Sequence, residues 1–258
     1  MYRGVQYRRL DTTEIRRLLD GAARHAAGVR RIFLADGDVM RRPFAELRAI
    51  LAELAVRFSD LARVNTYATG SAIAAKTDGE LAELRALKLH TLYLGLESGD
   101  AETLRRVRKG EEIETMIGAA ARAQAAGLRL SVMVLLGLGG RERTREHAAA
   151  TADALNRMQP RLLSALRAIP VPGTELYDDV RAGRFAQVSE RGAVEELRLM
   201  VGRLELTNTV FRANHTSNVV PLEARFPRDK AVLLEQLDAV LAAGGLDAAG
   251  PGPQPLWL

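Results

Sequence analysis

The stretch Thr91-Leu92-Tyr93-Leu94-Gly95-Leu96-Glu97-Ser98-Gly99-Asp100 determines how the rest of the chain is interpreted. Residues 92–96 are apolar or glycine, a run typical of a strand buried on both faces of a parallel sheet. The run stops at Glu97-Ser98, and the residues that follow predict a helix with an acidic N-cap. A carboxylate and a hydroxyl therefore stand at the carboxyl end of a buried parallel strand, where α/β proteins bind their ligands.

The same pattern of a strand followed by a helix recurs about every 30 residues on both sides of this stretch. Such a period predicts an α/β fold, here an incomplete, open parallel βα barrel of the TIM-like type. Right-handed crossovers then bring the carboxyl ends of all five strands to one rim. The predicted strands are 29–35, 63–68, 92–96, 128–136 and 162–169.

The pattern begins with a helix rather than a strand. Asp11-Thr12-Thr13-Glu14 resembles a capping signal for that helix, and its partner strand would fall before Met1, so we expect the barrel to lack its first strand. Residues 1–185 are predicted to form the partial barrel, and residues 186–258 a C-terminal helical extension packed on it. The helices expected in this extension are 189–206 and 227–243.

The composition of the chain limits the class of protein to which it can belong and the partners it can have. The 258 residues carry a net charge of +5 and few aromatic side chains, and no apolar run approaches the length of roughly 18 residues that spans a bilayer. The N-terminus has no signal-peptide core, so we expect a cytoplasmic protein with no membrane partner. The arginines occur mostly as scattered pairs with few aromatics between them to stack on bases. This favours a solvated arginine-rich surface over a nucleic-acid partner.

Five motifs, in the right order along the chain, resemble those of radical S-adenosylmethionine (radical SAM) proteins. Each motif alone is weak, and the resemblance rests on their order over nearly the whole chain. The last motif resembles the C-terminal extension of one uncharacterised bacterial branch. The motifs are Phe33–Asp38, Leu94–Gly99 with Lys109-Gly110, Gly137–Gly140, Ile169–Thr174 and Phe211–Asn218.

The resemblance implies an open six-unit barrel in which a Cys-x3-Cys-x2-Cys loop after the first strand holds a [4Fe–4S] cluster. The cluster chelates the amino and carboxylate groups of S-adenosylmethionine and cleaves it reductively to a 5′-deoxyadenosyl radical, with electrons from a reductant such as ferredoxin or flavodoxin. This chain has no cysteine, which excludes a cluster held by its own thiolates. The resemblance begins at Met1-Tyr2-Arg3-Gly4, just after the place where related members carry the last cysteine.

Carried over position by position, the resemblance assigns the methionine end of the cofactor first. Asp36-Gly37-Asp38 occupies the family's Gly-Gly-Glu position, with Asp in place of the first glycine, and its backbone would meet the ammonium group, which needs acceptors. Lys109 or Arg108 would meet the carboxylate, as cations should. Glu97 and Ser98 match fourth-strand residues near the ribose and the methionyl moiety.

The resemblance assigns the nucleoside end to two later turns. Gly137 to Gly140 would let the backbone approach the nucleoside, and Ile169 to Val171 would flank the adenine. No catalytic residue and no metal ligand is assigned. The candidate cofactor-binding residues are Asp36, Gly37, Asp38, Glu97, Ser98, Lys109, Gly137, Gly139, Ile169 and Val171.

Structural roles compete with several of these assignments. Asp36 and Asp38 are also placed to cap the helix that follows, and Lys109 to stand as an exposed cation at a helix end. Among the histidines, His147 on an amphipathic helix is expected to be structural. Only His215 lies in a polar constellation, between two asparagines.

Three functions remain open from the sequence. The first is a radical SAM enzyme whose cluster loop lies upstream of Met1, so that the chain as given is truncated and inactive. The second is a pseudoenzyme that keeps the barrel as a binding module. The third is a barrel enzyme holding Mg²⁺ or Mn²⁺ on the hard oxygen ligands of Asp36, Asp38 and Glu97. The substrate stays open, because radical SAM barrels support very different chemistries.

Overall fold

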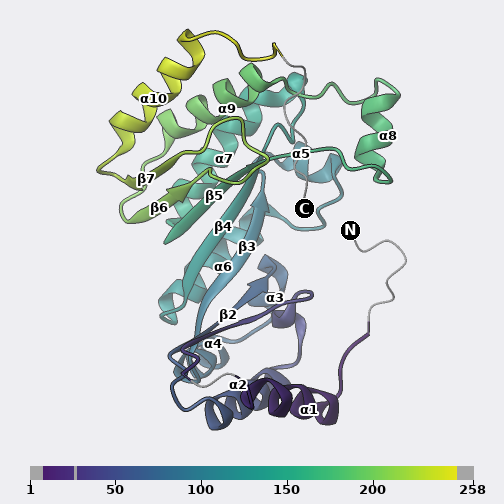
Figure 1. Ribbon diagram of the computed structural model, residues 1–258, viewed down its shortest axis with the longest axis vertical. Helices are drawn as coiled ribbons and strands as arrows, with labels where there is room; N and C mark the ends of the chain where they lie inside the picture. The colour runs from purple at the N-terminus through teal and green to yellow at the C-terminus, as the bar shows by residue number, and fades with distance from the viewer. Residues whose placement is uncertain (1–7, 26–27, 249–258) are drawn as a thin grey trace.

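The computed structural model describes residues 8–25 and 28–248. Within them the chain forms one twisted seven-stranded sheet in the order β1 to β7, with the long helices packed on its outer face (Figure 1). Strands β1 to β6 run parallel, and β7 pairs antiparallel with β6. The strands are β1 (Arg31–Leu34), β2 (Arg63–Ala68), β3 (Leu89–Glu97), β4 (Arg129–Leu136), β5 (Leu162–Arg167), β6 (Thr209–Arg212) and β7 (Glu223–Phe226).

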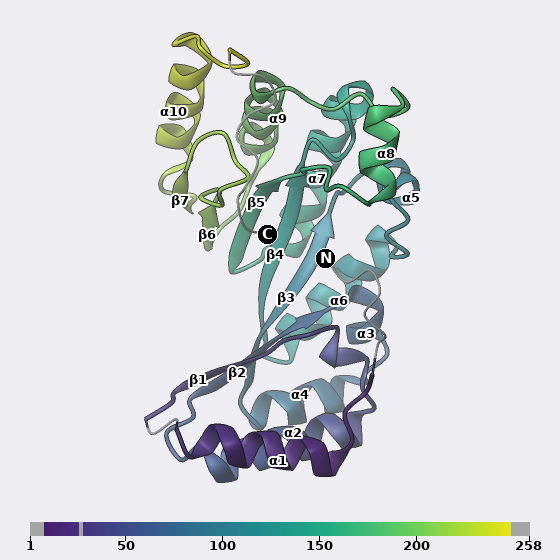
Figure 2. The ribbon, with the colours of Figure 1, turned by 45° about the vertical axis from the view of Figure 1, so that its right-hand side comes forward.

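The helices alternate with the strands as the sequence period predicts. The longer ones cover the sheet, whereas α3, α5 and α8 follow directly on strand ends at the rim (Figure 2). The helices are α1 (Thr12–Ala23), α2 (Phe44–Arg57), α3 (Gly70–Ala74), α4 (Asp78–Ala86), α5 (Ala101–Arg106), α6 (Ile113–Ala125), α7 (Thr144–Met158), α8 (Glu175–Arg181), α9 (Glu190–Arg203) and α10 (Lys230–Ala242). Among the described helices, none combines the length and apolar composition that a bilayer crossing requires.

The sheet does not close, and the predicted open parallel βα barrel is therefore confirmed. In the described chain, β1 pairs only with β2 and β7 only with β6. The capping box predicted at Asp11 is present, because its carboxylate accepts the Glu14 amide at 2.8 Å and the Glu14 carboxylate accepts the Asp11 amide at 3.1 Å. Helices α9 and α10 lie in the predicted extension, and between them the structure has β6 and β7, which continue the sheet from β5.

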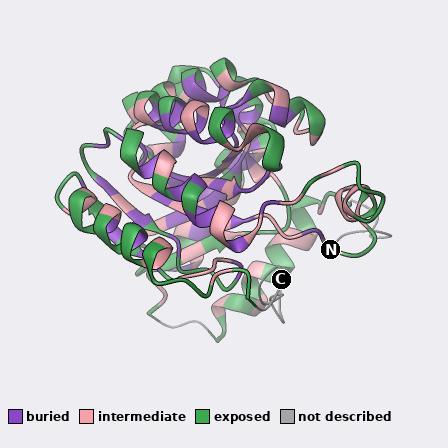
Figure 3. Cartoon of the chain, turned by 90° about the horizontal axis from the view of Figure 1, so that it is seen from above, coloured by how far each residue is buried: buried purple, intermediate pink, exposed green. Residues whose placement is uncertain are grey.

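Strand β3 has two unlike faces. Leu92, Leu94 and Leu96 are fully buried beneath the helices, and each contributes about 2 kcal/mol by leaving water. Tyr93 and Glu97, on the opposite face, are only half-buried. The prediction of a strand buried on both faces is thus wrong for one face, because the described residues leave the inner, concave face of the open sheet partly exposed (Figure 3).

Three aromatic rings gather on the concave face, one from each of β1, β2 and β3. Phe33 contacts Tyr67 and Tyr93 edge-on, with ring centroids 4.9 and 5.0 Å apart. Phe33 and Tyr67 remain 39% and 42% exposed. These rings form the apolar part of the concave face below the rim on which the strands end.

Candidate functional site

Glu97 ends β3 in a left-handed backbone conformation, with φ of 60°. Its carboxylate folds back over Gly95 and accepts a hydrogen bond from Lys109 Nζ at 2.9 Å. A Cβ atom on Gly95 would lie 3.1 Å from both Glu97 Cδ and Lys109 Nζ, so the missing side chain makes room for the ion pair. Both side chains are a little over one fifth exposed, and the pair is therefore accessible from the concave face.

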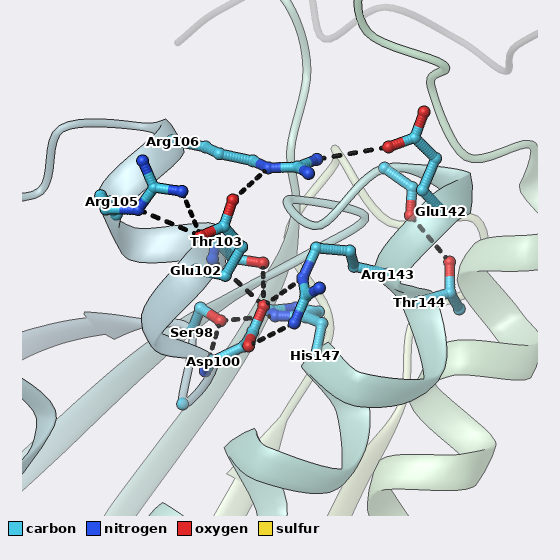
Figure 4. A network of polar contacts seen from close by, with 12 residues as sticks. Ser98, Asp100, Glu102, Thr103, Arg105, Arg106, Glu142, Arg143, Thr144 and His147 are labelled. Carbon is cyan, nitrogen blue, oxygen red and sulfur yellow. Dashed lines mark hydrogen bonds and ion pairs between the residues drawn. The ribbon is translucent and has the colours of Figure 1, made fainter.

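Ser98 follows the left-handed Glu97, and its side chain is buried inside the protein beside His147 (Figure 4). Its Oγ lies 2.7 Å from His147 Nδ1 and accepts the amide hydrogen of Asp100 at 2.9 Å. Both Ser98 and His147 are almost completely buried. The Ser98 hydroxyl is engaged in both hydrogen bonds and holds the turn after β3. The buried placement of His147 agrees with the structural role predicted for it.

Asp100 joins the turn after β3 to the loop after β4 (Figure 4). Its carboxylate caps α5 through the Thr103 amide and receives two hydrogen bonds from the Arg143 guanidinium at 2.8 and 2.9 Å. The arginine, opposed by desolvation, lowers the pKa of Asp100 to about 2. This pair is 11% and 26% exposed at its side chains, so it fixes two rim loops against each other.

A second series of polar contacts ties together the turns after β1 and β2 and the loop between α5 and α6. Asp38 Oδ2 accepts hydrogen bonds from the Thr69 hydroxyl at 2.6 Å and the Thr69 amide at 3.2 Å. Ser71, two residues further, donates its amide to Glu111 at 2.9 Å and also contacts this carboxylate through its hydroxyl. Asp38 Oδ1 is buried, and no group within residues 8–25 and 28–248 hydrogen-bonds to it. Among the described residues, Asp38 therefore keeps one acceptor without a donor.

The other predicted residues lie on the same rim, in different surroundings. Asp36 and Gly37 are exposed at the tip of the turn after β1, both with positive φ. Gly137 and Gly139, after β4, are buried, and a Cβ on Gly139 would lie 3.1 Å from His147 Cβ. Ile169 and Val171, after β5, are half-buried. The Met1–Gly4 segment lies outside the described residues.

The structure does not support the divalent-metal alternative. No group of three or more His, Cys, Asp or Glu side chains within residues 8–25 and 28–248 is placed to hold a metal ion. Asp38 and Glu97 stand on turns two strands apart, which corresponds to about 10 Å across a sheet. Glu97 is paired with Lys109, and Asp38 with Thr69.

His215 lies in the segment after β6. Its side chain is exposed, and Nδ1 lies 2.8 Å from Ser217 Oγ. Ser217 in turn accepts the Arg167 amide, and Asn218 donates to the Ala165 carbonyl at 2.8 Å. In the structure this polar segment fastens the chain after β6 to the end of β5.

One buried group at the site was missed from the sequence. Glu196, on α9, is fully buried, and its Oε1 accepts the Gly137 amide at 2.6 Å and lies 3.4 Å from His147 Nε2. A signal was present, because Glu196 falls on the apolar stripe of α9. A carboxylate on a buried stripe requires a partner, and here the partners are the β4 turn and α7. The stripe is Ala193, Leu197, Met200, Val201 and Leu204.

The chain belongs to the Radical SAM superfamily, whose sequence profile matches residues 2–155. No curated protein matches the chain significantly. The family explains the arrangement described above, an open parallel barrel whose strand ends carry polar turns on one rim.

Solved structures with a similar fold include proteins of this family. The Elp3 protein of the archaeon Methanocaldococcus infernus, with residues 1–46 deleted, superposes with a TM-score of 0.59 at 16% identity, over 91% of this chain and 59% of that one. Methylornithine synthase gives 0.54 at 17% identity, over 96% and 76%. Coproporphyrinogen III oxidase from Escherichia coli, described as a radical SAM enzyme, gives 0.53 at 15% identity, over 89% and 44%. At these identities the likeness concerns the fold, and this chain spans less than two thirds of the Elp3 structure.

Proposed function

We propose that this chain is the S-adenosylmethionine-binding part of a radical SAM enzyme, and that it binds the cofactor along the rim of the concave face. The observation that carries the proposal is the accessible Glu97–Lys109 ion pair at the end of β3, held over Gly95. S-adenosylmethionine carries a sulfonium, an ammonium and a carboxylate, so its net charge is positive. A rim that offers two carboxylates and one lysine complements this charge pattern.

Each part of the cofactor has a partner of suitable chemistry on the rim. The unpartnered Asp38 Oδ1 and the backbone of the turn at Asp36-Gly37 would accept hydrogen bonds from the ammonium. Lys109 would bind the carboxylate, and Glu97 would accept hydrogen bonds from the ribose hydroxyls. Ser98 is best assigned a positioning role, because its hydroxyl is buried and already engaged.

The adenine is assigned to the later strand ends. Ile169 and Val171 offer half-buried apolar surface, and the glycines after β4 carry no side chain that would block the nucleoside. The same turn is held by a hydrogen bond from the Gly137 amide to the buried Glu196 carboxyl group. A rigid turn of this kind reduces the ordering cost of binding.

The residues of this chain do not fit the family's iron–sulfur cluster. Such a cluster requires cysteine thiolates, and the sequence contains none. We therefore assign no reductive step to the chain as given. In the proposed full-length form the cysteine loop precedes Met1. The edge of β1 with which no described strand pairs supports this, since a further parallel strand would pair there.

Binding of S-adenosylmethionine, measured by equilibrium dialysis, tests the proposal. We expect Glu97→Gln and Lys109→Met each to weaken binding at least tenfold, because a charge-assisted contact contributes about 1.5–3 kcal/mol. Glu114→Gln is the matched control, since it breaks an exposed Glu–Arg ion pair between α6 and α7. Binding that is unaffected by both rim substitutions, or absent from the unaltered chain, would overturn the proposal.

The second candidate is a pseudoenzyme that binds the cofactor without cleaving it. The missing cysteines favour it as much as they favour truncation. The coding sequence upstream of Met1 separates the two. An in-frame Cys-x3-Cys-x2-Cys establishes the truncated enzyme, and a stop codon directly upstream rules it out.

A further inference from the structure

A chain of buried polar groups runs from α9 to the turn after β3. Ser98 Oγ lies 2.7 Å from His147 Nδ1. His147 Nε2 lies 3.1 Å from the Leu135 carbonyl and 3.4 Å from Glu196 Oε1, and that oxygen accepts the Gly137 amide at 2.6 Å. All three side chains are at most 2% exposed. The chain of groups thus links four elements, namely the ends of β3 and β4 and the helices α7 and α9.

Burial keeps the His147 ring neutral, and its hydrogen bonds select the tautomer. Burial lowers the pKa of His147 to about 4, so the ring is neutral at pH 7. Its Nε2–H donates to the Leu135 carbonyl, which leaves Nδ1 to accept the Ser98 hydroxyl hydrogen. Ser98 Oγ then accepts the Asp100 amide. The Ser98 hydroxyl therefore acts as donor and acceptor at once and holds the turn from both sides.

Glu196 completes the chain as a neutral acid. Burial raises its pKa to about 8, opposed by the hydrogen bond from Gly137. In the described residues no lysine or arginine pairs with it, and the ionisable group that faces it is the neutral His147. Its second oxygen, Oε2, is buried and has no hydrogen-bond partner in the part of the chain that the structure describes. A protonated carboxyl tolerates this environment, whereas a carboxylate would not.

The turn held by this chain carries Glu97. Gly99 packs tightly on α7, where a Cβ atom would lie 2.6 Å from Thr151 Cα, and its amide donates to Thr151 Oγ1 at 2.9 Å. Glu97 precedes the turn with φ of 60°, a conformation that costs about 1 kcal/mol or more and persists only where its surroundings hold it. The direction of the Glu97 carboxylate therefore depends on where Ser98 and Gly99 are held.

We infer that Glu196 and His147 are positioning residues for the cofactor rim, so that α9 belongs to the binding machinery although it lies outside residues 2–155. They act through Ser98 on Glu97, and through the Gly137 amide on the turn after β4. The inference rests on the proposed function for the identity of the ligand. The mechanical link itself does not depend on that identity.

Two measurements on the full chain test the inference. The first is S-adenosylmethionine affinity, and the second is amide hydrogen exchange by NMR at Asp100 and Gly99, with Leu94 in the centre of β3 as the internal reference. Glu196→Ala removes the acceptor of the Gly137 amide hydrogen bond. His147→Phe keeps an aromatic ring but removes the hydrogen bonds of the imidazole. Glu196→Gln preserves a neutral acceptor, and Glu195→Gln, one residue away and exposed, is the matched control.

We expect Glu196→Ala and His147→Phe to weaken binding at least tenfold and to lower protection at Asp100 and Gly99 at least tenfold relative to Leu94. Glu196→Gln and Glu195→Gln stay within twofold of the unaltered chain. A merely stabilising role would lower protection at all three amides alike, which overturns the inference. Unchanged protection of the turn in the Ala variant also overturns it.

If the Glu196→Ala variant fails to fold, the pH dependence of exchange protection in the unaltered chain and in Glu196→Gln decides instead. In the unaltered chain, turn protection relative to Leu94 falls as the pH rises through 8, and in Glu196→Gln it does not. Equal pH profiles overturn the inference. If S-adenosylmethionine does not bind the unaltered chain at all, the proposed function fails, while the exchange measurements still decide whether Glu196 and His147 hold the turn.

Discussion

Replacing Glu196 with glutamine should remove a distinct pH dependence of stability. The pKa of Glu196 is raised from 4.5 to about 8 in the folded protein, so between these values the folded state binds one proton more than the unfolded state. Stability then falls as the pH rises. His147 acts in the opposite sense, because its folded pKa of about 4 lies below the ordinary 6.5, and its contribution makes stability rise over that interval.

The two effects leave one window in which Glu196 acts alone. Between pH 4.5 and 6.5 they largely offset each other. From pH 6.5 to about 8 the histidine contributes no further change, and the carboxyl continues to lower stability by about 1.4 kcal/mol per pH unit. The loss over this window is about 2 kcal/mol. The Glu196→Gln side chain has no ionisable proton, so this variant should show none of this loss of stability.

Urea denaturation at several pH values between 6 and 9 measures this difference directly. We expect the free energy of unfolding of the unaltered chain to fall by about 2 kcal/mol between pH 6.5 and 8 relative to Glu196→Gln. All other ionisable groups are shared by the two proteins and cancel in the comparison. Parallel curves for the two proteins would refute the reasoning, since they would show that Glu196 is ionised in the fold at neutral pH.

Three further substitutions at the rim have separable outcomes. Gly95→Ala should weaken S-adenosylmethionine binding in dialysis while the protein stays folded by circular dichroism, because the new methyl displaces only the flexible end of the Glu97 ion pair; unchanged affinity would contradict this. Gly99→Ala should lower the free energy of unfolding by about 1–3 kcal/mol or more, since its methyl meets the backbone of α7; a stable variant would show that the turn is loose. Asp100→Asn should lower the free energy of unfolding at pH 7 by about 2 kcal/mol in urea titrations, because the pKa of Asp100 is lowered from 3.8 to about 2 in the fold. This stabilisation is present above pH 3.8 and is lost as the pH falls towards 2. An equal loss of stability in the variant at pH 2 would argue against it.

Most helices and strands could be predicted from the sequence, because the hydrophobic period agrees locally with the capping residues, glycines and prolines at the ends of the elements. Strand β2 has the predicted bounds, 63–68, and the capping box at Asp11 opens α1 as predicted. Strands β6 and β7 were not predicted. Each has four residues, too few to show a period, and each forms only where the sheet edge supplies backbone partners.

The site was predictable only in part. The order of the motifs placed the strand ends along the chain, but it did not separate Glu97, which pairs with Lys109, from Ser98, which is buried. The partners of Ser98 could not be found locally, because His147 lies 49 residues further along the chain. Such contacts depend on how α7 and α9 pack. Sequence patterns report on burial more directly than on which polar groups meet.

Anaerobic reconstitution of this chain with iron and sulfide, followed by S-adenosylmethionine and a chemical reductant, tests the central claim most directly. That claim is that the chain carries the cofactor-binding rim without the ligands of the cluster. We predict bound S-adenosylmethionine that is lost in Glu97→Gln, no iron–sulfur absorbance and no 5′-deoxyadenosine. Cluster absorbance with 5′-deoxyadenosine from this chain, or the absence of cofactor binding, would contradict the account.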